Sequence, residues 1–182
     1  MSDPETLFER LAAARAERSL PPVERWHPTR QGKSGISIDV DGNWYYQGSE
    51  IRRPEMVKLF STVLRRDADA FVLVTPAERL TVEVADAPFV AVDFERRGAG
   101  STQELAFATN VGDVVIADAT HPLTISGSDQ TPRPYLRVRG ELDARLSRAV
   151  YYRLIDIAIE RNEGLGVWSA GAFFRLGPYM FG

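Results

Sequence analysis

Residues 44–60 read WYYQGSEIRRPEMVKLF and residues 135–151 read YLRVRGELDARLSRAVY, and these two stretches decide the predicted fold. When they are superposed 91 positions apart, Glu50 falls on Glu141 and Phe60 falls on Tyr151. Each stretch reads as a short strand, a glutamate followed by Ile or Leu, and then apolar residues at helical spacing. A repeated unit of this kind predicts a duplicated architecture, with a binding site favoured in the seam between the copies.

The elements around the two stretches also follow one order, which supports a duplication. Both halves read as strand, turn or loop, strand, helix, strand, turn and strand. Modules that combine one helix with a mainly antiparallel sheet belong to the α+β class. We therefore predict a short N-terminal helix within residues 1–20, a first module over 21–98 and a second over 99–182. Chance spacing of common elements is the alternative, because the halves share few identical residues.

The first module is predicted to begin with an irregular segment over residues 23–35 and then to form a hairpin. Asp41-Gly42-Asn43 has the spelling of a tight turn between strands. Pro54 opens a helix with a buried apolar stripe formed by Met56, Val57, Phe60, Val63 and Leu64. The glycine-rich stretch 96–101 is expected to separate the modules. The strands expected here are 36–40, 44–47, 71–74, 80–84 and 89–94.

The second module is predicted to contain the longest helix of the chain, over residues 145–161. Its apolar stripe is wide, which indicates burial on more than one side. Residues 127–134 are polar and carry glycine and proline, so they predict a loop. The strands expected in this module are 104–109, 113–117, 123–126, 135–138, 164–169 and 172–176.

The composition is that of an ordinary globular protein, with 182 residues, 44% hydrophobic, 26% charged, and a formal net charge of −3. This charge argues against unspecific nucleic-acid binding, which needs a basic excess to release counterions. The chain has no cysteine, so disulfides, thiol nucleophiles and cysteine-ligated metals are excluded. The sequence shows neither a secretory signal nor an apolar run long enough to span a bilayer. We expect a cytoplasmic protein without a membrane span.

Sequence motifs of common enzymes do not occur. Gly32-Lys33-Ser34 lacks the upstream glycine of a phosphate-binding loop and leads into a strand instead of a helix. The sequence contains no nucleophile elbow, and His27 and His121 each precede a proline in an expected loop. We therefore expect no cofactor, no metal and no catalytic residues, and we favour a non-enzymatic function.

One weaker enzymatic alternative rests on Glu50 and Glu141, which hold equivalent places in the repeat. Two carboxylates related by pseudo-symmetry can act as an acid and a base, as in a hydrolase. The simpler interpretation is structural, because a carboxylate at a helix start accepts backbone hydrogen bonds and opposes the helix dipole.

Arginine and aromatic residues gather on the repeated strands. Tyr135, Arg137 and Arg139 alternate, so their side chains share one face of a strand. Guanidinium groups beside aromatic rings favour an anionic, planar ligand through bidentate hydrogen bonds and stacking. A solvated face paired with neighbouring acids is the alternative. The predicted ligand-binding residues are Trp44, Tyr46, Arg52, Arg53, Tyr135, Arg137 and Arg139.

Three stretches carry a resemblance to a known family: residues 36–51 with the turn DGNWYYQG, residues 52–60 (RRPEMVKLF) and residues 166–177 (GVWSAGAFFRLG). With them the chain resembles an uncharacterised proteobacterial family, domain of unknown function 1285. The resemblance implies a duplicated α+β core with a pleckstrin-homology-like C-terminal module. It also implies a small-ligand site between the modules, for a nucleotide-like molecule, and a role in signalling. It implies no catalytic residues.

These observations together predict a non-enzymatic cytoplasmic ligand-binding or signalling module. Its expected partner is an anionic, nucleotide-like small molecule, held at the interface of the two repeated modules. The alternative is an adaptor that binds a protein partner through exposed strand edges or the loop over residues 127–134. A hydrolase that uses the paired glutamates is the third hypothesis.

Overall fold

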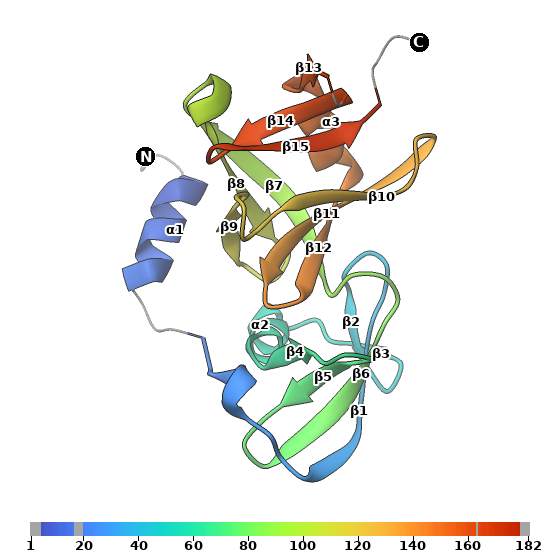
Figure 1. Cartoon of the computed structure of the whole chain (residues 1–182). Coiled ribbons are helices and arrows are strands. Elements are labelled where there is room, and N and C mark those ends of the chain that lie inside the picture. The colour runs from blue at the N-terminus through green and yellow to red at the C-terminus, as the bar shows by residue number, and fades with distance from the viewer. Residues whose placement is uncertain (1–4, 17–19, 163, 179–182) are drawn as a thin grey trace.

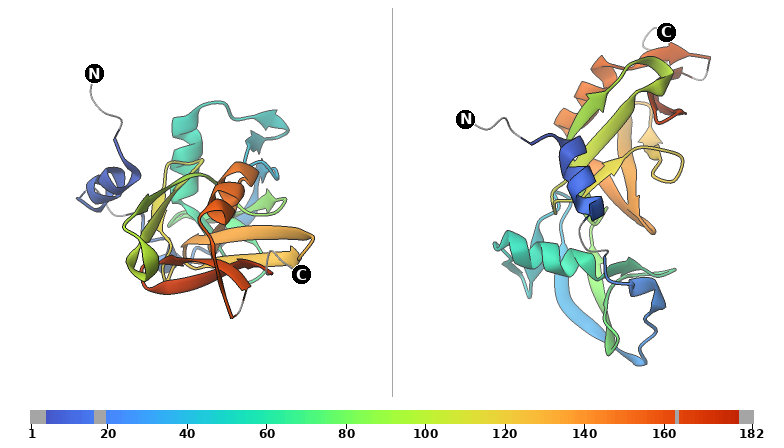
Figure 2. Two further views of the ribbon diagram at one scale, coloured as in Figure 1. Left: turned by 90° about the horizontal axis from the view of Figure 1, so that it is seen from above. Right: turned by 90° about the vertical axis from the view of Figure 1, so that its left-hand side faces the viewer.

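The computed structural model describes residues 5–16, 20–162 and 164–178. Within these residues the protein consists mostly of strands, arranged as two six-stranded mixed sheets in tandem with a small third sheet and three α-helices (Figure 1). The N-terminal helix α1 (Leu7–Ala16) packs against strands of the second sheet, as the turned views show (Figure 2). The predicted N-terminal helix is therefore confirmed over these residues, while residues 1–4 and 17–19 lie outside the described part of the chain.

The first sheet is a pair of three-stranded meanders with a helix between them. A turn at Asp41-Gly42-Asn43 joins the first two strands, because Gly42 adopts a positive φ of 82° and Asp39 accepts backbone hydrogen bonds at 2.9 Å from Asp41 and Asn43. The elements are β1 (Arg30–Ile38), β2 (Trp44–Tyr46), β3 (Ser49–Glu50), α2 (Pro54–Thr62), β4 (Leu64–Arg66), β5 (Phe71–Val74) and β6 (Glu78–Val84), and a short 3₁₀ turn, η1 (Val23–Arg25), precedes them.

The second sheet repeats the two meanders without a helix between them, and α3 and the third sheet follow. Its strands are β7 (Phe89–Arg97), β8 (Glu104–Thr109), β9 (Val114–Ile116), β10 (Leu123–Ser128), β11 (Thr131–Arg139) and β12 (Leu142–Leu146), with η2 (Gly100–Thr102) between β7 and β8. The chain then forms α3 (Arg148–Asp156), β13 (Ile159–Arg161), β14 (Gly164–Ser169) and β15 (Ala172–Gly177).

Both six-stranded sheets have the same strand order. Across each sheet the strands run third, second, first, sixth, fifth and fourth, and the first and sixth are parallel. The two halves thus share an architecture, but β1 corresponds to β7, so the predicted correspondence of Trp44 with Tyr135 is wrong. The helices are not equivalent either, since α2 follows the third strand of its sheet and α3 follows the sixth.

The boundary between the two sheets falls between β6 and β7. The first module was predicted to extend to residue 98, yet β7 pairs with β8 and β12 and belongs to the second sheet. The glycine-rich stretch after β7 is instead a hairpin connection within that sheet, because Arg97 pairs directly with Glu104 across it. Gly98 supports this connection with a φ of 79°.

The predicted long helix over residues 145–161 is wrong. Burial alternates over Leu142, Ala144 and Leu146, and this period-two pattern places them in β12. Ser147 then caps α3 by accepting a hydrogen bond of 3.3 Å from the Val150 amide. The helix ends at Asp156, and residues 159–161 form β13. The wide apolar stripe therefore combined a strand, a helix and a second strand.

Two other segments contain more strand than the sequence predicted. Residues 127–134, expected as a loop, continue the hairpin of β10 and β11. Pro132 and Pro134 are tolerated there because β11 gains its second neighbour, β12, only from Tyr135 onward. In the irregular entry over residues 23–35, β1 begins at Arg30 and runs parallel to β6. The hairpin at residues 41–43, the helix from Pro54, the strand over residues 71–74 and the final hairpin over 164–176 are confirmed. The buried stripe predicted for that helix is wrong in part, because Met56 is 40% exposed and Leu64 lies beyond the helix, in β4.

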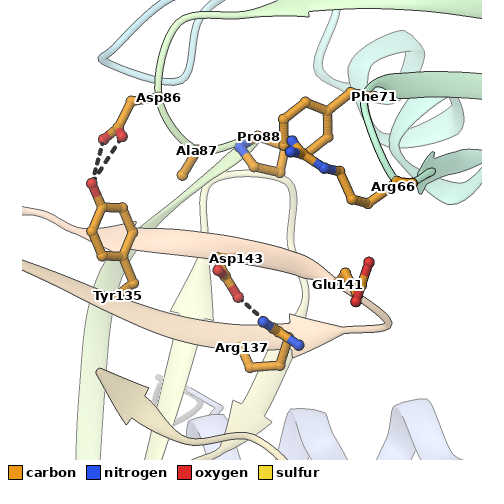
Figure 3. A pocket seen from close by; sticks show the side chains of 10 residues that line it. Arg66, Phe71, Asp86, Ala87, Pro88, Tyr135, Arg137, Glu141 and Asp143 are labelled. Atoms are coloured by element: carbon orange, nitrogen blue, oxygen red, sulfur yellow. Dashed lines mark hydrogen bonds and ion pairs between the residues drawn. The ribbon is translucent and has the colours of Figure 1, made fainter. Parts of the chain in front are cut away.

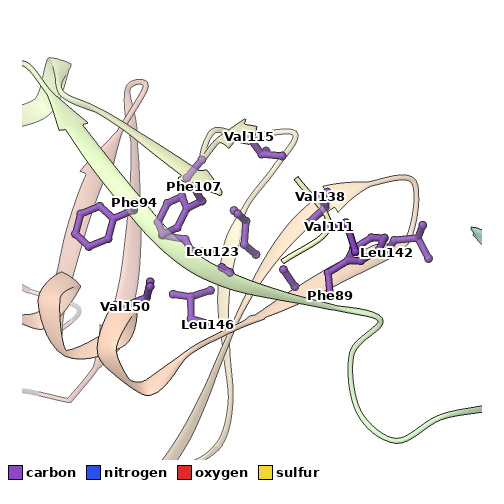
Figure 4. Packing of buried hydrophobic residues seen from close by; sticks show 14 of the residues in the cluster. Phe89, Phe94, Phe107, Val111, Val115, Leu123, Val138, Leu142, Leu146 and Val150 are labelled. Carbon is purple, nitrogen blue, oxygen red and sulfur yellow. The ribbon is translucent and has the colours of Figure 1, made fainter. Parts of the chain in front are cut away.

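One contiguous hydrophobic core extends through both sheets. In the second sheet the rings of Phe94 and Phe107 stack with their centroids 5.5 Å apart, surrounded by buried aliphatic side chains (Figure 4). Between the sheets, the Asn110 side chain donates to the Gly42 carbonyl at 3.0 Å and accepts from the Val90 amide at 2.9 Å. The predicted turn at Gly42 therefore also joins the two halves.

Candidate functional site

A hollow of about 420 Å³ lies in the seam between the two sheets, and we name it the seam hollow (Figure 3). It is bounded by β4 and β5 of the first sheet, by β11, β12 and their turn in the second, and by the connection between the sheets. Its charged lining residues are Arg66, Asp86, Arg137, Glu141 and Asp143, and its ring-bearing residues are Phe71, Pro88 and Tyr135.

The charges of the seam hollow largely satisfy one another. Arg137 Nε donates to Asp143 Oδ1 at 2.5 Å, and Nη1 donates to the Gly140 carbonyl at 3.2 Å. The Tyr135 hydroxyl donates to the two Asp86 carboxylate oxygens at 2.8 and 3.0 Å. Burial, and then the hydrogen bond to Asp86, raises the pKa of Tyr135, so the phenol keeps its proton.

The lining of the seam hollow does not favour an anion. The Arg66 guanidinium lies over the Phe71 ring, 4.2 Å from its centroid. The hollow contains two arginines and three carboxylates, a formal sum of −1. This balance suits hydroxyl or amino groups of a ligand better than a phosphate.

A larger hollow of about 1090 Å³ lies at the start of α3, and we name it the arginine hollow. Its walls are the β10–β11 hairpin, the end of β12 and the first turns of α3, with the turn at Asp41 contributed by the first sheet. Three arginines line it, Arg133, Arg145 and Arg148, and with Asp41 they give a formal sum of +2. The arginine hollow therefore has the charge that an anionic ligand requires.

Arg145 is incompletely satisfied in this hollow. Its Nε atom is buried and has no hydrogen-bond partner among the described residues. Its Nη2 lies 3.8 Å from Asp41 Oδ1, which is too long for a hydrogen bond. The side chain is 31% exposed, so its guanidinium is accessible to a ligand.

The start of α3 adds to the positive potential. Arg148 is the first residue of the helix, and the first turn contains no acidic residue. A cation at a helix N-terminus is unfavourable, because it adds to the positive end of the helix dipole. The Tyr152 ring is 58% exposed at the edge of the hollow, whereas the Tyr151 hydroxyl donates to the Leu176 carbonyl at 2.9 Å. Burial raises the pKa of Tyr151, so this phenol also keeps its proton.

The structure does not bring the seven predicted ligand-binding residues into one site. Tyr135 and Arg137 line the seam hollow. Tyr46, Arg52 and Arg53 line a separate hollow of the first sheet, which has a mainly apolar wall. The prediction of a shared aromatic and arginine face is therefore wrong as to the grouping of these residues.

Two of the predicted ligand-binding residues have structural roles instead. Trp44 is 1% exposed and belongs to the hydrophobic core. Arg139 donates to Asp113 Oδ2 at 2.5 Å and to the Ser61 carbonyl at 2.7 Å, and it lies over the Phe89 ring. Arg139 thus joins the second sheet to the end of α2.

The two glutamates of the weaker enzymatic hypothesis line different hollows. Glu50 lies on β3 beside the apolar hollow of the first sheet, and Glu141 lies in the turn between β11 and β12 beside the seam hollow. Their places in the two sheets are not equivalent, because β3 is the third strand of its sheet and the β11–β12 turn joins the fifth and sixth.

Sequence reasoning missed the residues of the arginine hollow. Arg133 lies in the predicted loop over residues 127–134, and Arg145 and Arg148 lie in the predicted long helix over residues 145–161. The available signal was Ser147, whose side chain is a preferred helix cap and separates a strand ending in Arg145-Leu146 from a helix starting at Arg148.

Among the described residues, no three His, Asp or Glu side chains lie together in a group that could hold a metal ion. In the same part of the chain, no helix is long and apolar enough to cross a membrane. His121 is instead part of a turn, where its Nδ1 lies 3.0 Å from Asp118 Oδ1.

Two family models match consecutive parts of the chain. Residues 21–87 match the domain of unknown function (DUF1285), N-terminal domain, and residues 88–176 match the protein of unknown function (DUF1285), C-terminal domain. The junction of the two matches coincides with the passage from β6 to β7.

Solved structures give the same result. The chain is similar to a DUF1285 family protein from Silicibacter pomeroyi DSS-3, with 42% identity and a TM-score of 0.83 over 97% of each chain. A DUF1285 family protein from Shewanella baltica OS155 is 30% identical, with a TM-score of 0.54 over 68% of this chain and 91% of that one. No curated protein matches the chain.

Proposed function

Since the chain belongs to the DUF1285 family and contains its N- and C-terminal domains in order, we propose that it is a non-enzymatic cytoplasmic module that binds an anionic, nucleotide-like small molecule between its two halves. The arginine hollow is the proposed site. The observation that carries the proposal is the excess of positive charge there, where three arginines meet the start of α3 with Asp41 as their acidic neighbour.

The contacts available in the arginine hollow match an oxyanion. Arg133 and Arg148 take part in no ion pair among the described residues, so their guanidinium groups are available to a ligand. Backbone N–H groups at the start of a helix supply further donors to an anion. The exposed Tyr152 ring offers a stacking surface for a planar group. A phosphate held by the arginines and a base against Tyr152 would use all of these features.

Binding at this site would also reach the first sheet. Asp41 lies in the turn that Asn110 holds against the second sheet, and its carboxylate is 3.8 Å from Arg145. A ligand phosphate that engages Arg145 competes with Asp41 for the same guanidinium. The occupancy of the hollow would thereby alter a contact between the halves, which is the physical basis for the proposed role in signalling.

A pleckstrin-homology-like form of the C-terminal half is part of the same proposal. It is supported by the meanders of the second sheet, by α3 packed on β7 and β14, and by the three-stranded sheet that packs against β8 and β10. In this half α3 precedes the last three strands, whereas in a simple sheet followed by a terminal helix the helix would come after them.

The proposal is tested by thermal shift with nucleoside mono-, di- and triphosphates and with inorganic phosphate. A ligand at 100 times its Kd stabilises by about 2.7 kcal/mol, which raises the Tm of a chain of this size by about 5–10 °C. Arg148→Ala should weaken binding of the active ligand by about 10- to 100-fold, because it removes a charged hydrogen-bond donor.

Arg30→Ala is the matched control, because Arg30 is exposed on the first sheet and is paired only with Glu78 at 3.6 Å among the described residues. It should leave the affinity unchanged. No Tm shift with any of these anions at millimolar concentration, or equal binding by Arg148→Ala and the wild type, would contradict the proposal.

A further inference from the structure

The hollow of the first sheet has a different chemistry from the two hollows described above. It encloses about 600 Å³ between α2 and strands β1, β5 and β6, and we name it the apolar hollow. Ile36 and Leu73 form its buried part, each less than 10% exposed. The apolar residues that line it are Ile36, Ile51, Met56, Phe60, Leu73 and Leu80.

An irregularity of β1 lies at the wall of this hollow. The pairing of β1 with β6 shifts between Lys33 and Ser37, so β1 contains two residues more than its partner across this stretch. The Ser34 hydroxyl donates to the Thr81 carbonyl at 2.7 Å and accepts from the Ile36 amide at 3.0 Å, which fixes the bulge. Bulges redirect side chains beside binding sites, and here the bulged residues Ser34 and Ile36 both line the hollow.

The mouth of the apolar hollow is basic. Arg53 precedes α2 without a side-chain capping hydrogen bond, and it takes part in no ion pair among the described residues. Arg52 is 86% exposed and lies 3.4 Å from Glu50, a contact that solvent screens strongly. With Glu50, which also lines the hollow, the two arginines give a formal sum of +1. An apolar wall with this net positive charge beside it complements a molecule that has an apolar tail and an anionic head.

We propose that the apolar hollow binds a small amphipathic anion, of the class of medium-chain carboxylates. Its volume lies in the range of small-molecule pockets, and the tail would displace water from apolar side chains that the sheet leaves partly uncovered. The carboxylate would lie at the mouth, near the Arg53 guanidinium and the start of α2. This site uses none of the residues of the arginine hollow, so the two binding functions are separable.

Isothermal titration calorimetry with hexanoate, octanoate and decanoate tests whether the apolar tail of the ligand contributes to binding. Each added methylene should tighten binding about fourfold until the hollow is filled. Decanol, which has the same tail as decanoate without the charge, should bind about fivefold more weakly than decanoate, the contribution of an exposed ion pair.

Two pairs of variants locate the site. Met56→Trp should abolish decanoate binding by filling the hollow, whereas Leu59→Trp should not, because Leu59 is 64% exposed on the same helix and does not line it. Arg53→Ala should weaken decanoate binding about fivefold, whereas Arg30→Ala should leave it unchanged. Arg148→Ala should bind decanoate normally, which separates this proposal from the one above.

Other outcomes would overturn the proposal. Non-saturating uptake of decanoate, or an equal loss in Met56→Trp and Leu59→Trp, would show adsorption to the surface of α2. Concentration-dependent self-association that Leu59→Asp abolishes would identify the helix as a contact between protein chains instead. Cosedimentation with phosphatidylglycerol vesicles, without saturable decanoate binding, would point to a lipid surface.

Discussion

The two six-stranded sheets share one strand order, yet they cover their apolar faces differently. In the second sheet, Leu105 and Phe107 of β8 are fully buried in the main core with residues of α3 and β14, and on the other face of β8 Ala106 and Ala108 pack against Leu7 of α1. In the first sheet α2 is the helix that covers the strands, and Leu80 of β6 remains half-buried beside the apolar hollow. The same topology therefore buries the apolar residues of β8 completely in the second sheet, whereas in the first sheet it leaves an open, mainly apolar hollow against β6.

This difference has a thermodynamic consequence. A fully packed core loses both transfer energy and packing when a side chain is removed, whereas a side chain beside an existing hollow leaves less new cavity behind. Binding of an apolar group needs the second situation, and stability needs the first. We expect the second sheet to contribute most of the stability and the first sheet to accept changes more easily.

The largest effect should come from emptying the closed core. Phe107→Ala should cost about 3–5 kcal/mol, because Phe107 is fully buried and stacks on Phe94. Leu73→Ala should cost about 2 kcal/mol, at the low end for its type, because Leu73 already borders a hollow. Urea unfolding of the two variants measures this difference. Equal losses would contradict the contrast between a closed and an open sheet.

The next effect concerns the turn that joins the halves. Gly42→Ala should cost about 2–4 kcal/mol, because Gly42 has a φ of 82° and an added Cβ would lie 2.7 Å from Asn110 Nδ2 and 2.8 Å from Val90 Cγ2. Gly48→Ala is the matched control in the same sheet. Its φ is also 82°, but nothing lies within 4 Å of an added Cβ, so only the backbone cost of about 1–2 kcal/mol applies. Identical Tm values for the two variants would show that the turn does not couple the sheets.

Local features of the fold could be predicted from the sequence because the residues that form them are contiguous. The turn at Gly42, the helix opened by Pro54 and the final hairpin at Gly171 each depend on backbone preferences within a few residues. The pairing partner of a strand does not depend on such local preferences. Nothing near β7 indicates that it pairs with β12 instead of β6, because that choice depends on contacts between distant segments.

The site residues show the same limit. The alternation that placed Tyr135 and Arg137 on one face is correct, since both line the seam hollow. The alternative prediction, that this face pairs with neighbouring acids, is confirmed for Arg137, which pairs with Asp143. The identity of that acid could not be predicted, because Asp143 lies across a hairpin in an unpredicted strand. Trp44 and Tyr46 alternate together on β2, yet Trp44 is buried and Tyr46 is half-exposed, because β2 spans only three residues and leaves the core at its end.

A smaller effect on stability is expected from replacing either of two arginines that lie two positions apart on β11. Arg139→Ala should cost about 2 kcal/mol, because it leaves Asp113 and the Ser61 carbonyl without their donor at a site where the arginine is 19% exposed. Arg137→Ala should cost less than about 1 kcal/mol, because its pair with Asp143 is more exposed. Chemical denaturation of both variants tests this order. A larger loss in Arg137→Ala would place the connection between the sheets at the seam hollow instead.

The smallest effect is the pH dependence of stability that one carboxyl group contributes in each half of the molecule. Burial alone would raise the pKa of Asp67, but hydrogen bonds from Arg65 and Arg79 outweigh it and lower the pKa below its usual value. Burial likewise opposes the hydrogen bonds from Thr120 and His121, which lower the pKa of Asp118. A folded-state pKa below the unfolded value of about 3.9 gives stability that is present above this pH and lost as the pH falls through the folded value.

Unfolding free energies measured from pH 7 down to pH 3 should therefore fall at the acid end, and both Asp67→Asn and Asp118→Asn should flatten that decline. Salt separates the two carboxyls. The partners of Asp67 are charged guanidinium groups, whereas Asp118 relies mainly on hydroxyl and backbone donors. At 0.5 M NaCl the Debye length is roughly 4 Å, so salt should weaken the Asp67 contribution more, by an amount that the burial of the two arginine side chains, 9% and 17% exposed, keeps small. The difference between wild type and Asp67→Asn should then shrink in salt, and the difference for Asp118→Asn should not. Equal salt sensitivity of both differences would show that the open half holds its carboxyl no differently from the closed half.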